Sequence, residues 1–92
     1  MALRAESVLT RSENASYEVV AGEAILIDVN SGTYFSLNAV GTQFWEQIDG
    51  TQSIQQHAET IAAKFSVDVP MVVADLTELA DSMAAEGLVS SA

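Results

Sequence analysis

Several kinds of functional chemistry are excluded because the residues that carry them are missing or rare. The 92 residues contain no cysteine, which excludes disulfides, thiolate metal sites and a cysteine nucleophile. A single histidine, His57, leaves little material for a metal site or a Ser-His-Asp triad. No glycine-rich loop suited to cradling a phosphate is present. We therefore expect a protein that needs no cofactor and is not an enzyme by itself.

Positive charge is equally scarce. Three Lys and Arg residues stand against thirteen Asp and Glu, which gives a formal net charge of −10. Binding to nucleic acid requires clustered Lys and Arg that neutralise phosphates and release counterions. An anionic membrane surface attracts the same kind of residue. We therefore expect neither nucleic acid nor a membrane among the partners.

Long hydrophobic runs are also missing. No apolar run exceeds four residues, as in residues 24–27, which is far shorter than the ~20 residues of a membrane span. The first twenty residues lack the basic start and apolar stretch of a signal peptide, so we expect a cytoplasmic protein. Apolar residues still make up 49 % of the chain, which is enough for one small core. We take residues 1–92 as a single domain, with a short first strand plus a loop over residues 1–18.

The first half of the chain is predicted to be extended. Residues 7–11 alternate weakly and suit a short edge strand, and residues 17–20 and 24–28 also favour strands. The clearest turn is Asn30-Ser31-Gly32, since Asn and Gly tolerate a positive φ. Residues 33–37 that follow are rich in aromatic and β-branched side chains. This pattern predicts a β-hairpin with a third strand beside it.

The second half changes to helical periodicity. Asn38, Ser53 and Asp68 are suitable N-caps for three helices, and Gln56 completes a capping box with Ser53. Pro70 fits the first turn of the third helix. The first helix is predicted to end at Asp49-Gly50. The third is predicted to run to about Glu86, with Gly87 after it and Leu88 supplying the apolar contact of a Schellman motif. The element order is therefore βββααα, an α+β fold.

The third helix divides into two faces on a helical wheel. The apolar arc holds Val72, Val73, Leu76, Leu79, Ala80 and Met83, and the acidic arc holds Asp75, Glu78, Asp81 and Glu86. One interpretation is a core face and a solvated face. The other concerns the boundary, where an apolar edge beside Asp75 suits a partner with apolar anchors and a Lys or Arg. Periodicity alone leaves both open.

The segment Thr33–Leu37 raises a similar alternative. It contains no proline and no charge, so nothing in it blocks pairing with another chain. If it is the free edge of the sheet, a peptide can add to it as a fourth strand. If it is interior or covered by the helices, it cannot. The pattern does not decide which strand is the edge.

Three single residues receive structural interpretations. His57 lies among polar neighbours and is predicted to be a solvated surface residue. Trp45 is predicted to belong to the core. Gly41 lies inside a helix, where glycine costs about 1 kcal/mol relative to alanine, so we expect a neighbour to pack closely there.

One long stretch carries a resemblance. It consists of Gly22–Asp28, Ser31–Asn38, Val40–Glu46 and Asp49-Gly50, followed by Phe65-Ser66-Val67-Asp68, Asp75 and Glu86–Val89. In their order and spacing, these segments resemble the PqqD-like family, the peptide-recognition domains of ribosomally made, modified peptides (RiPP recognition elements). The resemblance covers about residues 19–89.

The resemblance implies a three-stranded antiparallel sheet followed by a winged-helix-like bundle of three helices. It also implies that the leader of a precursor peptide adds to the third strand, in a groove between that strand and the third helix. Carried onto this sequence, the peptide-binding residues are Thr33, Tyr34, Phe35, Ser36 and Leu37 on the strand and Val72, Asp75, Leu76 and Leu79 on the helix. Catalysis is then expected from a partner, such as a radical SAM enzyme, a leader peptidase or a cyclase.

Two alternatives come from other functional classes. A winged-helix DNA-binding or transcription-related protein has a similar element order, but Lys64 is the sole basic residue after residue 11. A carrier protein needs a modifiable serine, and Asp81-Ser82-Met83 only loosely matches the required context. A phosphopantetheine adduct on Ser82 in a mass spectrum is the observation that would favour the carrier.

Overall fold

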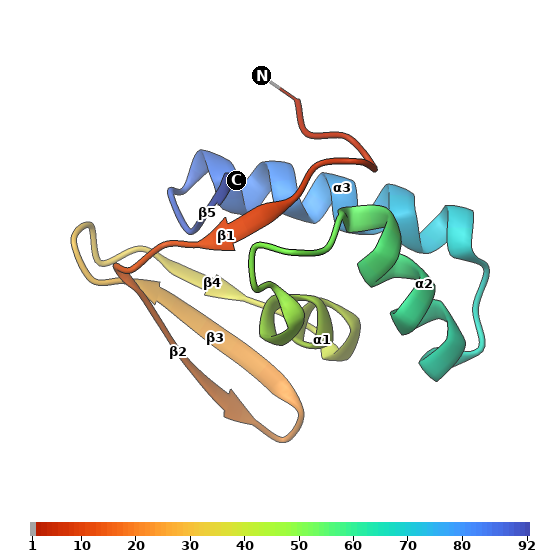
Figure 1. Ribbon diagram of the computed structural model, residues 1–92. Coiled ribbons are helices and arrows are strands. Elements are labelled where there is room, and N and C mark those ends of the chain that lie inside the picture. Colours follow the sequence, from red (N-terminus) through yellow and green to blue (C-terminus); the bar gives the residue numbers. More distant parts are fainter. Residues whose placement is uncertain (1) are drawn as a thin grey trace.

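The computed structural model describes residues 2–92, which form five strands and three helices (Figure 1). In chain order the elements are β1 (Leu9–Arg11), β2 (Ala15–Val20), β3 (Glu23–Asp28), β4 (Tyr34–Ser36), α1 (Ala39–Gln47), α2 (Ile54–Phe65), α3 (Val69–Ala85) and β5 (Val89–Ser91). The helices gather on one side of the sheet, and the β2–β3 hairpin projects away from them (Figure 1). The α+β class and a three-stranded antiparallel sheet are confirmed.

The three-stranded sheet has the order β2-β3-β4, so β3 is central and β4 is an edge. Within it Leu26 pairs with Tyr17 on one side and with Phe35 on the other. The predicted turn before β4 is present, with Gly32 at φ 75° and its N–H bonded to the carbonyl of Asp28 at 2.7 Å. β4 is shorter than expected, because Thr33 and Leu37 lie just outside it.

The order βββααα is incomplete, and the expected edge strand over residues 7–11 lies in a different sheet. β1 pairs with β5, a strand that the sequence pattern did not predict, and Leu9 lies opposite Ser91. The N–H of Ala92 continues this ladder to the carbonyl of Val8 at 2.7 Å. Strands of three residues are too short to show alternation. This pairing joins the two ends of the described chain and buries Leu9 and Val89.

Local capping explains where most helices begin and end. The side chain of Asn38 accepts the N–H of Gly41, and Ser53 and Gln56 form the predicted capping box. The end of α3 is a Schellman motif, with N–H bonds from Gly87 to Ala84 and from Leu88 to Met83. Asp68 stands at the N-cap of α3 but makes no capping hydrogen bond. Pro70, at the second helical position, removes one of the two N–H groups that such a cap binds.

The core lies where α1 meets β3 and the other two helices. Phe44 and Trp45 of α1 are almost fully buried, as predicted for Trp45, together with Leu26 of β3 and Leu76 of α3. Thr42 is a buried polar residue whose Oγ1 accepts the N–H of Ala24 at 2.8 Å. This bond joins α1 to β3, so the sheet is held at a defined position beside the helices.

His57 is buried, and the prediction that it is a solvated residue was wrong. Its exposed fraction is 1 %, its ring packs edge-on against Phe44, and its Nδ1 lies 3.4 Å from Oε1 of Gln47. His57 is three residues after Ile54 and four before Ile61, so it shares their buried face despite its polar neighbours in sequence. Burial lowers the pKa of His57, and the nearby carboxylate of Asp49 partly opposes this shift.

Candidate functional site

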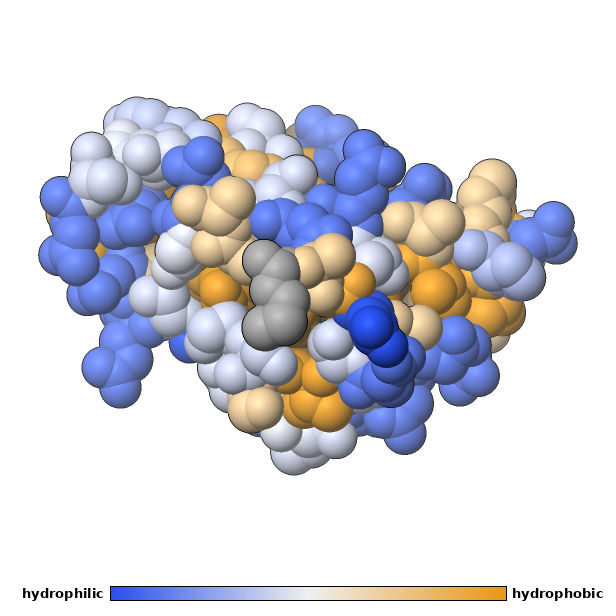
Figure 2. Space-filling view, turned by 90° about the horizontal axis from the view of Figure 1, so that it is seen from above, coloured by the Kyte–Doolittle hydropathy of each residue, from blue (hydrophilic) through white to orange (hydrophobic). Residues whose placement is uncertain are grey.

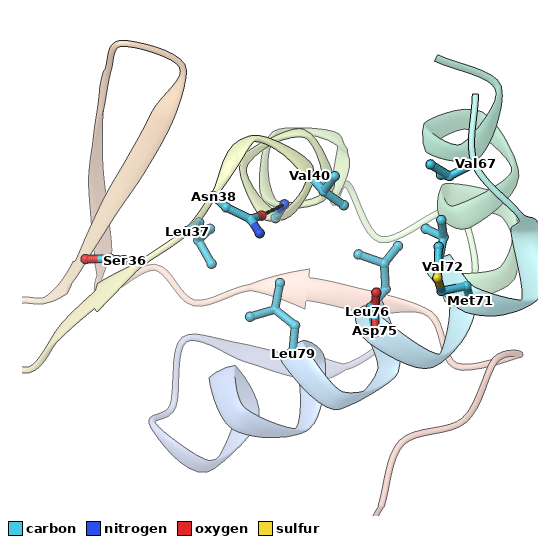
Figure 3. Close-up of a pocket in the computed structure, with 11 residues that line it drawn as sticks. Ser36, Leu37, Asn38, Val40, Val67, Met71, Val72, Asp75, Leu76 and Leu79 are labelled. Atoms are coloured by element: carbon cyan, nitrogen blue, oxygen red, sulfur yellow. Dashed lines mark hydrogen bonds between the residues drawn. The ribbon is translucent and has the colours of Figure 1, made fainter. Parts of the chain in front are cut away.

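A groove of about 350 Å³ opens between the end of β4, the start of α1 and the exposed side of α3 (Figure 3). Its lining consists of Ser36, Leu37, Asn38, Val40, Gly41, Val67, Met71, Val72, Asp75, Leu76 and Leu79. Six of the nine residues predicted to bind a peptide are in this lining, namely Ser36, Leu37, Val72, Asp75, Leu76 and Leu79. The structure therefore places the end of the segment Thr33–Leu37 next to the Asp75 side of α3, the two regions whose role the sequence pattern left open.

The wall on α3 follows the boundary between the two faces of that helix. Val72 and Leu76 are buried, whereas Leu79 is half-buried and Asp75 is exposed. Leu76 and Leu79 point from α3 towards α1 and Leu37 (Figure 3). The helix therefore offers an apolar wall with a carboxylate on its rim.

Gly41 allows the floor of the groove to be narrow. A Cβ atom there would lie 3.2 Å from Cδ2 of Leu79 and 3.3 Å from Cδ2 of Leu37. Both distances are tighter than ordinary van der Waals contact, so the absence of a side chain lets α1 approach α3. The predicted close packing at Gly41 is confirmed, with groove side chains as the neighbours.

Five lining residues were missed by the sequence analysis, namely Asn38, Val40, Gly41, Val67 and Met71. Met71 and Val67 are exposed to 53 % and 40 %, although both are apolar. Met71 lies four residues before Asp75 on the same side of α3, so helical spacing could have included it. In Figure 2 hydrophobic residues gather towards the right, where Figure 1 shows α2 passing into α3.

The edge of β4 carries backbone groups that β3 does not use. The N–H of Leu37 bonds to Ala24, and the carbonyl of Thr33 accepts from Asp28. Because hydrogen-bonding residues alternate along an antiparallel strand, the N–H and C=O groups of Tyr34 and Ser36 point away from β3. Within residues 2–92, no hydrogen bond outside the sheet ladder reaches them. This edge can therefore accept another strand.

Three predicted residues do not line the groove. Thr33 lies before β4, Phe35 is half-buried opposite Leu26, and Tyr34 is 70 % exposed on the far face of the sheet. Side chains of a strand alternate between its two faces, so a whole strand cannot turn towards α3. Ser36 contributes mainly through its backbone, since its hydroxyl points away from α3 (Figure 3).

Comparison with known proteins identifies the family. The family model described as coenzyme PQQ synthesis protein D (PqqD) matches residues 23–89. This chain belongs to the PqqD family. The solved structure of TbiB1 in complex with the TbiA(beta) leader peptide is also similar, with a TM-score of 0.77 and 29 % sequence identity over 87 % of this chain and 93 % of that chain. No curated protein matches at a significant level.

The groove of this PqqD-family chain has an acidic rim. Asp75 and Leu79 also border a second hollow along α3, together with Glu78 and Ser82. The one ion pair found within residues 2–92 joins Arg4 to Glu6, so neither Asp75 nor Glu78 is neutralised by it. The groove therefore combines apolar walls with carboxylates that are free to pair with a ligand.

Neither a cluster of metal-binding side chains nor a membrane-spanning helix is found among residues 2–92. Residues 2–92 hold no cluster of three His, Asp or Glu side chains arranged to bind a metal ion. None of the described helices is both long and apolar enough to cross a membrane. The groove and the β4 edge lie next to each other, so one ligand can contact both.

Proposed function

We propose that this chain binds the leader segment of a ribosomally made precursor peptide as a strand added along β4. The observation that carries the proposal is the free edge of β4, at Tyr34 and Ser36, opening beside an apolar groove. Membership of the PqqD family and the similarity to TbiB1, solved with a leader peptide, support the same function.

The binding energy has two sources. Backbone bonds to Tyr34 and Ser36 are independent of the leader sequence, and each contributes about 0.5–1.5 kcal/mol. Side chains on alternate positions of the leader enter the groove, where Leu37, Leu76 and Leu79 offer apolar contacts. Burying one large apolar side chain contributes about 1.5–3 kcal/mol. The groove therefore selects one or two apolar leader residues.

Charge adds selectivity. Asp75 and Glu78 attract a Lys or Arg of the leader and repel acidic segments. Such exposed pairs change association rate and specificity more than they change affinity. We expect a leader with a basic residue next to its apolar anchor.

In this proposal the chain is a non-catalytic peptide chaperone in the cytoplasm. It holds the leader while a partner enzyme, such as a radical SAM enzyme, a leader peptidase or a cyclase, acts on the rest of the precursor. Holding both in one complex raises the effective concentration of the reacting segment to the millimolar range for a short flexible connection, on the order of 10⁻³ M. No cofactor is needed for this role.

The two alternatives gain no support. A winged-helix likeness of the three helices stays a prediction. The carboxylates Asp75 and Glu78 of α3 and Glu86 at its C-cap are exposed, and they would repel DNA phosphates. For the carrier, Ser82 is exposed and its hydroxyl donates to the carbonyl of Glu78. An ordinary helix surface explains that contact.

A ¹⁵N–¹H correlation titration tests the proposal with the leader of the precursor encoded beside this gene. We expect shifts concentrated at residues 33–41 and 67–79, with little change on the exposed side of α2. Calorimetry on the same peptide supplies the affinity. Shifts confined to β1 and β5, or saturation without any change along β4, would contradict strand addition at this edge.

A further inference from the structure

Exposed hydrophobic side chains fall in two regions of the described chain. Val67 and Met71 belong to the groove. The other six lie between residues 17 and 34, in the three-stranded sheet and its turns: Tyr17, Val19, Val20, Ile25, Val29 and Tyr34. The register divides these six residues: Tyr17 and Val19 pair with Leu26 and Ala24 and share their face, and Val29 lies in the turn after β3. Val20, Ile25 and Tyr34 share the other face, and the groove does not account for them.

The sheet is covered on one face and open on the other. Ala24 and Leu26 of β3 point into the core and have no exposed surface. Ile25 and Ile27, which alternate with them, point to the opposite side. A hollow of about 490 Å³ lies over that side, lined by Ser16, Tyr17, Glu18, Ile25, Ile27 and Tyr34. We call this side the outer face.

The register arranges the outer face in two rows that run across the strands. One row is Glu18–Ile25–Ser36, and the other is Ser16–Ile27–Tyr34. Each row ends at β4, at the edge whose backbone groups are free. A strand added there places every second side chain next to Ser36 or Tyr34, at the end of a row. A bound leader therefore extends the outer face with its own residues.

We propose that the outer face, completed by the leader, is the surface to which the modifying enzyme docks. This inference rests on the proposed function, because the leader strand supplies part of the surface. An enzyme that contacts both the outer face and the leader strand binds the leader-bound chain more tightly than the chain without leader. By linkage, the enzyme then tightens leader binding by the same factor.

The chemistry of the surface defines the partner. Ile25, Ile27 and Tyr34 form its apolar centre, and Glu18 lies at its edge without an ion pair within residues 2–92. The chain as a whole carries a net charge of −10. The docking region of the enzyme should therefore be an apolar patch bordered by Lys or Arg, and its binding should weaken as salt is raised.

The test uses the enzyme encoded beside the precursor gene and measures its Kd for the full chain, with and without saturating leader. We expect the leader to tighten this Kd at least tenfold, and Ile25→Lys to abolish that gain while leaving the leader Kd within twofold. Val29→Lys is the matched control, because Val29 is 61 % exposed in the turn after β3 and the charge change is identical. Ile25→Thr, which keeps a β-branched side chain, serves if Ile25→Lys fails to fold.

Each other result has a defined meaning. An enzyme that binds Ile25→Lys and Ile25→Thr as well as the wild type overturns the docking surface. Equal enzyme affinity with and without leader overturns the part of the inference in which the leader completes the surface. The leader titration without enzyme is run first: no binding there overturns the proposed function, and this inference with it. Normal leader binding followed by an enzyme insensitive to Ile25 overturns this inference alone.

Discussion

β1 and β4 are both three-residue strands, yet they differ in what their edges meet. β1 pairs with β5, and bonds from Ser12 to Leu88 and from Ala92 to Val8 extend the contact at both ends. β4 pairs with β3 on one side and leaves Tyr34 and Ser36 free on the other. The closed pair buries Leu9 and Val89, whereas the open edge borders a groove. Short strands therefore serve stability in one region and recognition in the other.

The largest effect is expected on the free energy of unfolding, from a substitution in the paired strands β1 and β5. Leu9→Ala removes a side chain that is 1 % exposed and packs in the core. A buried Leu→Ala change costs about 2–5 kcal/mol, depending on how far the cavity collapses. Urea denaturation should show this loss in the free energy of unfolding. In the absence of denaturant the leader affinity should stay near that of the wild type, and a parallel loss of affinity would show that the two regions are coupled.

Substitutions in the groove should weaken leader binding and leave the protein folded, the opposite of what Leu9→Ala should do. Leu79→Lys places a charge on an apolar wall, and Asp75→Arg reverses the charge on the rim. We expect Leu79→Lys to weaken leader binding at least tenfold and Asp75→Arg to do so by a smaller factor, because Asp75 is exposed. Both variants should remain folded in circular dichroism. Calorimetry that gives equal affinity for the wild type and both variants would exclude this groove as the binding site.

The open edge can be tested at a single backbone N–H. Ser36→Pro removes an N–H that points away from β3, so the sheet ladder keeps its bonds. We expect a severalfold loss of leader affinity with a smaller loss of stability than Leu9→Ala causes. Ser36→Ala, which retains the N–H, separates the backbone from the hydroxyl and should weaken binding less. If both variants bind equally well, the leader does not pair with this edge.

Much of this architecture could be predicted because its signals are local. The caps at Asn38 and Ser53 and the Schellman end at Gly87 depend on contacts within a few residues of the chain. The pairing of β1 with β5 joins residues about 80 positions apart in strands too short to show a pattern, so no local signal exists. His57 was misjudged because its neighbours in sequence outweighed its position on the helical face.

Of the two walls of the candidate site, the one on α3 was predictable from the sequence and the one on β4 was predictable only in part. Helical periodicity placed Val72, Leu76 and Leu79 on one side of α3, and these residues do line the groove. On β4, the register decides which side chains and amides turn outward, and register depends on tertiary pairing. For this reason the strand was predicted as a whole, although only Ser36 and the adjoining Leu37 reach the groove.

The smallest effect tests whether the helical contact between α1 and α2 is independent of the groove. Burial lowers the pKa of His57 below its ordinary 6.5, so the unfolded chain binds a proton more readily than the folded one as the pH falls below 6.5. The free energy of unfolding should therefore decrease only slightly from pH 7 towards pH 5, because the carboxylate of Asp49 opposes the shift. Its slope should stay well below the limit of about 1.4 kcal/mol per pH unit that one proton sets. His57→Gln should flatten this part of the pH profile in urea denaturation. If the profile of His57→Gln matched that of the wild type, His57 would not be the cause of the pH dependence. The leader affinity at pH 7 should be the same for both proteins, because His57 packs against Phe44 and does not line the groove.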